Sequence, residues 1–216
     1  MKQLLCSLAA LCSISFYCTA QQSKEYAASH ALNKLHITGD FDGDKIPDTI
    51  YQHNYSTLRK KEIVNSPDPA KEDWDSIVKW FYREESDVYL SLNKKKSPAL
   101  HLGTGQGLYC LINIGDINHD GKDEIALVAD LCDYSSVNTC RIYSLCNHKW
   151  IMLKEFGIHE SAFYFTGDKM PVFNIIKGFL EKQNNTWRYS DYNQSDYSTE
   201  QEVGKMKILV LRKCGS

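Results

Sequence analysis

The sequence predicts an all-β protein, and this prediction depends on three observations. Two acidic loops, at 40–48 and 116–124, each lead directly into a run of aliphatic or alternating residues. Similar short runs recur along most of the chain between Gly, Asp and Asn turns, which is typical of antiparallel strands. Apolar residues at helical spacing stand out near 69–84. We therefore expect antiparallel sheets with one helical insertion.

The first 20 residues have the pattern of a secretory signal peptide. Lys2 precedes an apolar run, and the small residue Ala20 ends it. The run is too short and wrongly flanked for a membrane span, and Cys12 and Cys18 lack the small residues that precede a lipidated cysteine. No later stretch reaches the roughly 18 apolar residues of a transmembrane helix. We expect cleavage before Gln21 and a secreted or periplasmic protein.

The charge balance argues against a nucleic-acid partner. The 216-residue chain has a formal net charge of −2 at pH 7, and loss of the leader with its single lysine makes the charge one unit more negative. Proteins that bind nucleic acids usually present a basic surface. We expect a protein or a glycan as the partner.

The loop at 116–124 has the pattern of a calcium site. Ca²⁺ takes about six to eight oxygen ligands, and alternate residues of a tight loop can turn oxygens inward. Gly121 accepts the positive φ of the turn, and the carbonyl of Lys122 is a further expected ligand. An EF-hand is excluded because its twelfth position, which needs an acid, is Leu127. The expected side-chain ligands are Asp116, Asn118, Asp120 and Glu124.

The loop at 40–48 repeats this pattern, so the chain contains an internal repeat. Lys45 occupies the turn position where the second loop has glycine. A lysine in the left-handed region costs roughly 1 kcal/mol, so we expect the first site to be weaker although it has one more carboxylate. The alternative is that both loops are Asp-Gly hairpin turns without a metal. The expected ligands are Asp40, Asp42, Asp44, the carbonyl of Ile46, and Asp48.

On these two loops the sequence resembles the FG-GAP, or VCBS, repeats. Their pattern is Gly-Asp, an apolar residue, Asp or Asn, any residue, Asp-Gly, two residues, Asp or Glu, and an apolar residue; 115–125 match it throughout, and 39–50 depart at Lys45. These repeats form the calcium-bearing blades of integrin α-subunit propellers and occur in many secreted bacterial proteins. The resemblance implies Ca²⁺ as cofactor and two, or two and a half, propeller-like antiparallel blades packed together. The implied blades are 36–107 and 108–159.

The first repeat follows a lead-in at 21–35, which reads as a short helix or an irregular segment. The insertion at 69–84 is expected to be a helix, with Asp68 as its cap and Pro69 at its first position. Its apolar stripe is expected to pack on a sheet; partner binding by Trp74 and Trp80 is the alternative. The expected strands are 35–38, 48–53, 87–92 and 98–102.

The second repeat is expected to be a four-stranded meander, with a Trp-centred last strand that also resembles the family. Gly103–Gly107 is a connection, because it lacks the Gly-Lys-Ser/Thr of a phosphate-binding loop. The segment 160–216 adds β structure and no third calcium loop. Propellers need about four to eight blades, so we expect sheets packed face to face instead of a closed propeller. The expected strands are 108–114, 124–132, 139–146, 149–156, 171–180, 185–189 and 205–211.

Five cysteines remain after the leader, and export favours disulfides. Because five is odd, at least one thiol is free or intermolecular. The sequence favours a Cys132–Cys140 bridge across a hairpin, while Cys214 pairs with Cys110 or Cys146. A nucleophilic cysteine beside a histidine is the functional alternative.

The function expected from the sequence is that of an exported, non-enzymatic, calcium-binding β-repeat module that binds a partner at the cell envelope. The seven histidines form no His-x-x-x-His or His-Glu-x-x-His motif, and no Gly-x-Ser-x-Gly elbow occurs. Two alternatives stay open: a hydrolase with a dispersed active site, and an inhibitor or immunity-type protein. A pocket away from the loops that gathers a histidine and a carboxylate would favour the hydrolase.

Overall fold

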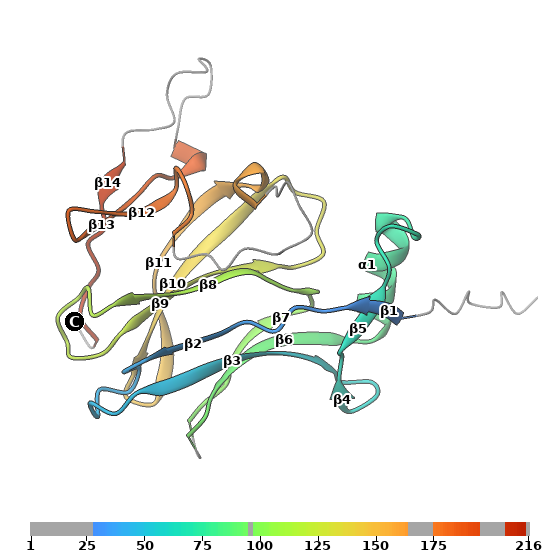
Figure 1. Ribbon diagram of the computed structural model, residues 1–216, viewed down its shortest axis with the longest axis horizontal. Helices are drawn as coiled ribbons and strands as arrows, with labels where there is room; N and C mark the ends of the chain where they lie inside the picture. The colour runs from blue at the N-terminus through green and yellow to red at the C-terminus, as the bar shows by residue number, and fades with distance from the viewer. Residues whose placement is uncertain (1–27, 95–96, 164–174, 195–205, 215–216) are drawn as a thin grey trace, which may run out of the picture.

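The computed structural model describes residues 28–94, 97–163, 175–194 and 206–214. These residues are mostly β, in four antiparallel sheets with one short α-helix (Figure 1). They do not form a propeller. The expected signal peptide and residues 171–174 of the expected strand 171–180 lie outside the described residues. Residues 175–179 form a bend and a turn, and a strand begins only at Leu180, so the expected strand is wrong over this part. Among the described residues of the expected strand 205–211, only Lys207–Ile208 is a strand.

The first large sheet is a meander with strand order β2-β3-β6-β7, and β4 pairs with the far end of β3. Along β3 the residues alternate between buried and partly exposed, as expected for a strand with one face on a core. The four strands expected in the first repeat are confirmed. The bounds are β2 His36–Gly39, β3 Asp48–Ser56, β4 Lys61–Glu62, β6 Ser86–Leu92 and β7 Leu100–Gly103.

The insertion between β3 and β6 contains the helix α1 (Trp74–Arg83). Asp73 caps it, because the Ser76 N–H donates to Asp73 Oδ1 at 2.9 Å. The expected start at Pro69 is therefore wrong: Asp68 closes a turn instead, accepting the Ala70 N–H at 3.0 Å. The helix buries Ile77, Val78, Trp80 and Phe81, but Trp74, the first residue of the expected apolar stripe, is exposed. The expected lead-in contains a strand, not a helix: β1 (Ala28–Ala31) pairs with β5 (Asn65–Pro67).

The second large sheet is the expected four-stranded meander, with order β11-β10-β9-β8. Alternate residues of β9 are buried on opposite faces of this sheet. Ile125 and Leu127 pack in a core shared with the first sheet, whereas Ala126 and Val128 face a second core. The bounds are β8 Gly107–Gly115, β9 Glu124–Asp130, β10 Val137–Cys146 and β11 Lys149–His159.

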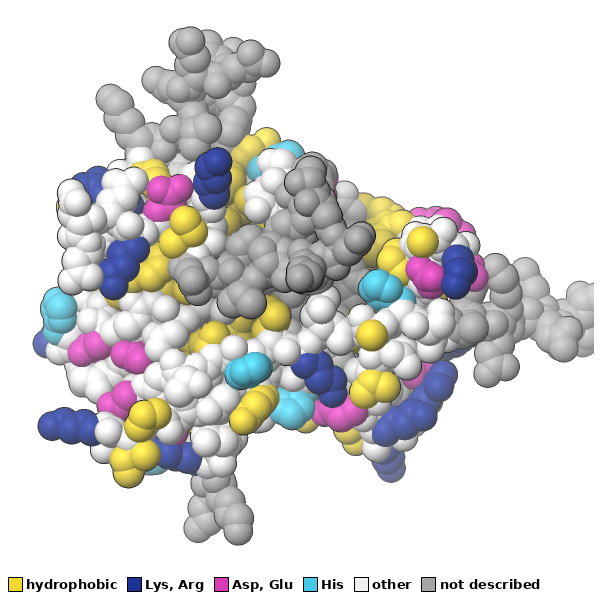
Figure 2. Space-filling view, in the orientation of Figure 1, with side chains coloured by type: hydrophobic (Ala, Val, Ile, Leu, Met, Phe, Trp, Pro, Cys, Tyr) yellow, Lys and Arg dark blue, Asp and Glu magenta, His cyan; other side chains and the backbone are white. Residues whose placement is uncertain are grey.

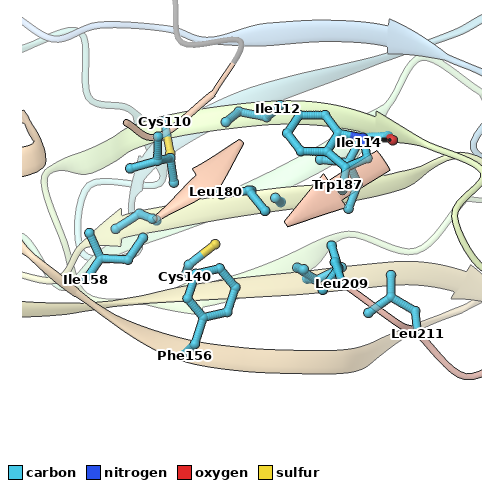
Figure 3. Packing of buried hydrophobic residues seen from close by; sticks show 14 of the residues in the cluster. Cys110, Ile112, Ile114, Cys140, Phe156, Ile158, Leu180, Trp187, Leu209 and Leu211 are labelled. Carbon is cyan, nitrogen blue, oxygen red and sulfur yellow. Dashed lines mark hydrogen bonds between the residues drawn. The ribbon is translucent and has the colours of Figure 1, made fainter. Parts of the chain in front are cut away.

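The C-terminal strands cover the other face of the second sheet, so that sheet is the middle layer of three (Figure 1). Figure 3 shows Trp187 beside Ile114, with Leu180, Leu209 and Leu211 in the same buried cluster. The Trp187 indole N–H also donates to the Ile114 carbonyl at 2.7 Å. The bounds are η1 Glu160–Phe163, β12 Leu180–Gln183, β13 Thr186–Tyr189, η2 Tyr192–Gln194 and β14 Lys207–Ile208.

The disulfide joins Cys146 to Cys214, with Cα atoms 5.4 Å apart. The predicted Cys132–Cys140 bridge is wrong, since both of these cysteines are free and buried, as is Cys110. Cys140 on β10 lies opposite Val128 on β9, so Cys132 is four residues further along the chain. At about 3.3 Å per residue this places it roughly 13 Å from the pairing position. Cys132 packs against the helix instead.

Thiol labelling tests this arrangement. Alkylation of the unfolded, unreduced chain should modify Cys110, Cys132 and Cys140 and leave Cys146 and Cys214 unlabelled. In a Cys214→Ser variant, Cys146 should gain a label, and the free energy of unfolding should fall by about 2–4 kcal/mol because a long loop is no longer closed. Protection of Cys132 and Cys140 in the unmodified chain would contradict the observed bridge.

Candidate metal centres

The two acidic loops lie side by side at one end of the molecule, where β2 turns into β3 and β8 turns into β9 (Figure 1). Asp123 joins them: its N–H donates to the Asp40 carbonyl at 2.8 Å, and its Oδ2 accepts the Asp40 N–H at 3.1 Å. The Asn113 amide donates to that same carboxylate at 2.9 Å and to the Thr38 carbonyl at 3.0 Å. The two repeats are therefore joined through their loops.

Both loops use the same internal hydrogen bonds. The first acid of each loop accepts the N–H of the sixth residue: Lys45 donates to Asp40 Oδ2 and Gly121 donates to Asp116 Oδ2, each at 3.0 Å. The N–H of the fifth residue donates to the side chain of the third, at 3.2 Å in the first loop and 2.9 Å in the second. The repeat that the sequence indicated is thus also a repeat of local structure.

Backbone strain does not distinguish the two loops, contrary to the expectation from the sequence. Lys45 has the expected positive φ, at 66°, where Gly121 has 90°. The fourth position is also left-handed in both loops, and there the first loop has Gly43, with φ 82°, while the second has His119, with φ 58°. Each loop therefore holds one non-glycine residue in this region, at a cost of about 1 kcal/mol.

In the second loop, oxygens of Asp116, Asp120 and Glu124 all lie within 4.8 Å of one another, so these residues could hold a metal ion. Asp120 Oδ1 and Glu124 Oε1 are buried, and no described group donates to them in hydrogen-bonding geometry. Leaving a buried polar atom unpaired costs about 1–3 kcal/mol, and more for a charged group. A cation at this position would remove that cost.

Glu124 is fully buried at the first residue of β9. Burial raises its pKa to about 7, although the N–H groups of Ile117 and Asn118, at 2.9 and 3.4 Å from Oε2, favour the ionised form. The donors near Glu124 are neutral groups, so they offset only part of the desolvation of the carboxylate. A nearby cation would favour the ionised carboxylate further.

The C-terminal segment closes over the second loop. The Asn118 amide donates to Asp120 Oδ2 at 3.2 Å and to the Arg212 carbonyl at 3.3 Å. The Cys214 N–H donates to the same Asp120 oxygen at 3.3 Å, and the disulfide to Cys146 fixes this segment. The ligand atoms gathered here are all oxygens, which suits a hard cation such as Ca²⁺ better than zinc. The carbonyl of Lys122 remains a predicted ligand.

The first loop differs because the chain supplies a cation of its own. Oxygens of Asp40, Asp42 and Asp48 also lie within 4.8 Å of one another. The ammonium of Lys94, however, lies 2.8 Å from Asp42 Oδ2, 2.7 Å from Asp44 Oδ2 and 2.8 Å from Asp48 Oδ1. Its hydrogen bonds to Asp42, the larger effect, and to Asp44, together with the nearby charge of Asp48, raise the pKa of Lys94 far above its ordinary value. Lys94 is not among the residues that the sequence predicts for this site.

The remaining predicted ligands of the first loop differ in their surroundings. Asp48 is fully buried, and neither of its oxygens has a hydrogen bond in good geometry, so its pairing with Lys94 is mainly electrostatic. The hydrogen bond from Lys94, together with one from the Ile46 N–H, lowers the pKa of Asp44. The Ile46 side chain is exposed, and its carbonyl remains a predicted ligand.

Comparison with known proteins yields no relative. The sequence matches no family model, and neither a curated protein nor a solved structure matches it. The resemblance to FG-GAP repeats therefore depends on the two loops and the strands around them. Among the described residues, no helix is long and apolar enough to cross a membrane.

The junction of the two loops can be tested at a pair of equivalent glycines. A Cβ on Gly39 would overlap the Asn113 amide and the Asp123 carboxylate, whereas one on Gly115 would meet nothing within 4 Å. Gly39→Ala should therefore lower the free energy of unfolding by about 2–3 kcal/mol through overpacking. Gly115→Ala should cost only about 1 kcal/mol, from its positive φ of 78°. Urea unfolding in chelator measures both; a larger loss from Gly115→Ala would contradict the role of this junction.

Proposed function

We propose that this chain is an exported β-repeat module that binds one Ca²⁺ in its second loop and uses the ion to hold a partner-binding domain together. One observation carries the calcium proposal. Two buried carboxylate oxygens without hydrogen-bond donors, Asp120 Oδ1 and Glu124 Oε1, belong to a triad with Asp116 whose oxygens lie within 4.8 Å. The resemblance to calcium-bearing repeats supports the same ion.

The negative charges of the three carboxylates in the second loop favour a cation at this position. At 4.8 Å, two carboxylates repel by about 1 kcal/mol in water and by about 3 kcal/mol at an effective dielectric constant of 20. No ion pair among the described residues joins Asp116, Asp120 or Glu124 to a basic side chain. A divalent ion would replace these repulsions with attractions, which favours calcium binding over a purely hydrogen-bonded turn.

The ion's role is proposed to be structural. The triad is hydrogen-bonded to the C-terminal segment through Asp120, and the loop contacts the first repeat through Asp123. Binding at this position would therefore stabilise the contact between three separate parts of the chain. Export is supported by the Cys146–Cys214 bridge, because disulfides persist mainly in oxidising compartments.

The outer face of the first sheet supports a protein or glycan partner. Tyr89 stacks on His53 with ring centroids 4.6 Å apart and lies 5.4 Å from His101, and His36 stacks on the exposed Tyr51. Figure 2 shows histidines and apolar side chains together on this face. Aromatic residues are enriched in binding surfaces because their rings bury a large area with few rotatable bonds.

A hydrolase remains the second candidate, because one hollow does gather a histidine and a carboxylate. It has a volume of about 220 Å³ and lies between β1, β5, α1 and β8, with His30, Tyr109 and Asp130 in its lining. The Asp130 carboxylate, however, accepts hydrogen bonds from the Gln106 side chain and the Cys132 N–H. This pairing suits a structural carboxylate better than one that orients a catalytic histidine.

Asp120→Ala and Asp44→Ala test the calcium proposal as a matched pair at the fifth loop position. Calcium at about 100 times its Kd adds about 2.7 kcal/mol to stability, or roughly 5–10 °C in Tm for a chain of this size. Asp120→Ala should remove most of this gain and Asp44→Ala little of it, each variant being compared with itself in chelator. If Asp44→Ala removes more of the calcium-dependent gain in Tm than Asp120→Ala does, the first loop and not the second is the tighter calcium site. If calcium does not change the Tm of the unmodified chain, the proposal that the chain binds calcium is contradicted.

A further inference from the structure

The position of Lys94 follows from strand register. Strands β3 and β6 pair Ile50 with Leu92. The next residues continue the ladder, since the Asn93 N–H donates to the Thr49 carbonyl at 3.0 Å and the Thr49 N–H donates to Asn93 Oδ1 at 3.1 Å. One further step places Lys94 directly opposite Asp48, the ninth residue of the first loop.

The second repeat has a neutral residue at the equivalent position. Strands β9 and β10 pair Ile125 with Tyr143, so the next step places Ser144 opposite Glu124, the ninth residue of the second loop. Ser144 is fully buried and carries no charge. The two repeats thus place a lysine and a serine at one structural position.

We propose that Lys94 is the resident cation of the first loop and that it limits calcium binding to the second loop. This inference depends on the proposed calcium function of the second loop. An ammonium group has three donors, and here it lies within 2.8 Å of Asp42, Asp44 and Asp48. Asp42 and Asp48 also belong to the triad that could hold a metal, so a metal ion and Lys94 would compete for the same oxygens.

The covalent attachment of Lys94 to the chain favours the lysine over a free calcium ion in this competition. Lys94 lies two residues after the end of β6 and belongs to the same chain as the loop, so it acts at a high effective concentration. If the Lys94 side chain is away from the three carboxylates in only about one molecule in a hundred, the apparent Kd of the first loop for calcium is about 100-fold higher than it would be without the lysine. Its side chain is 28% exposed and Asp48 is fully buried, so loss of the ammonium would leave a buried, unpaired carboxylate.

Lys94→Ser converts the first loop to the arrangement of the second, and Lys45→Ser is its control. Lys45 belongs to the first loop and Lys94 contacts it, so both substitutions remove one positive charge next to the same acids. All ion pairs of the first loop among the described residues, however, involve Lys94. In chelator, Lys94→Ser should lower Tm by about 5–10 °C relative to Lys45→Ser. In a calorimetric titration, Lys94→Ser should bind two Ca²⁺ per chain, and both Lys45→Ser and the unmodified chain should bind one.

Two measurements keep this inference separate from the calcium proposal. The comparison in chelator contains no calcium, so equal Tm values for the two variants would overturn the role of Lys94 even if the second loop binds the ion. Two equal calcium sites in the unmodified chain would also overturn it. If neither the unmodified chain nor any variant binds calcium, the proposed calcium function is wrong. The proposed competition between Lys94 and calcium for the first loop is then wrong as well.

The unmodified chain offers a readout that does not depend on a variant folding. A lysine ammonium held by three carboxylates exchanges its protons slowly, so its Nζ resonance should be visible by ¹⁵N NMR in chelator. That resonance should persist when the first equivalent of calcium has bound. Its loss at one equivalent would show that calcium displaces Lys94 first, which contradicts the proposal.

Discussion

Two fully buried carboxylates, Asp48 and Glu124, impose the constraint on which this end of the molecule depends. Each begins the strand that follows an acidic loop, and each is surrounded by further acids of that loop. A buried charge is tolerated only when it is paired or coordinates a metal. The chain meets this requirement at Asp48 with the ammonium of Lys94, whereas at Glu124 the described partners are neutral. The proposed calcium ion would meet the same requirement there.

The residues around these two sites connect them to other parts of the chain. Asp123 and Asn113 hold the two loops together, so the first and second repeats share one junction. The C-terminal segment reaches the same place through the Cys146–Cys214 disulfide and the hydrogen bond to Asp120. A cation in the second loop would therefore act on contacts between segments far apart in sequence. Such contacts contribute to global stability more than a turn within one hairpin does, which is why thermal unfolding is a suitable readout.

Much of the fold could be predicted because its signals are local. Hydrophobic alternation and turn residues identified both four-stranded meanders, and the spacing of acids identified the triads that include Asp48 and Glu124. The rest depends on tertiary register. Lys94 lies 46 positions after Asp48 in the sequence and becomes its neighbour only once β3 and β6 are paired. The bridge from Cys146 to Cys214 likewise spans 68 residues, and a short hairpin spacing favoured the wrong pair. Both failures involve contacts that no local pattern encodes.

X-ray diffraction from crystals grown with calcium, recorded at a wavelength where calcium scatters anomalously, would locate the ion and the Lys94 side chain in one experiment. We expect one anomalous peak per chain, among the oxygens of Asp116, Asp120 and Glu124, with the Lys94 nitrogen still beside Asp42, Asp44 and Asp48. A peak in the first loop with Lys94 turned away, or no peak in the second loop, would contradict this expectation.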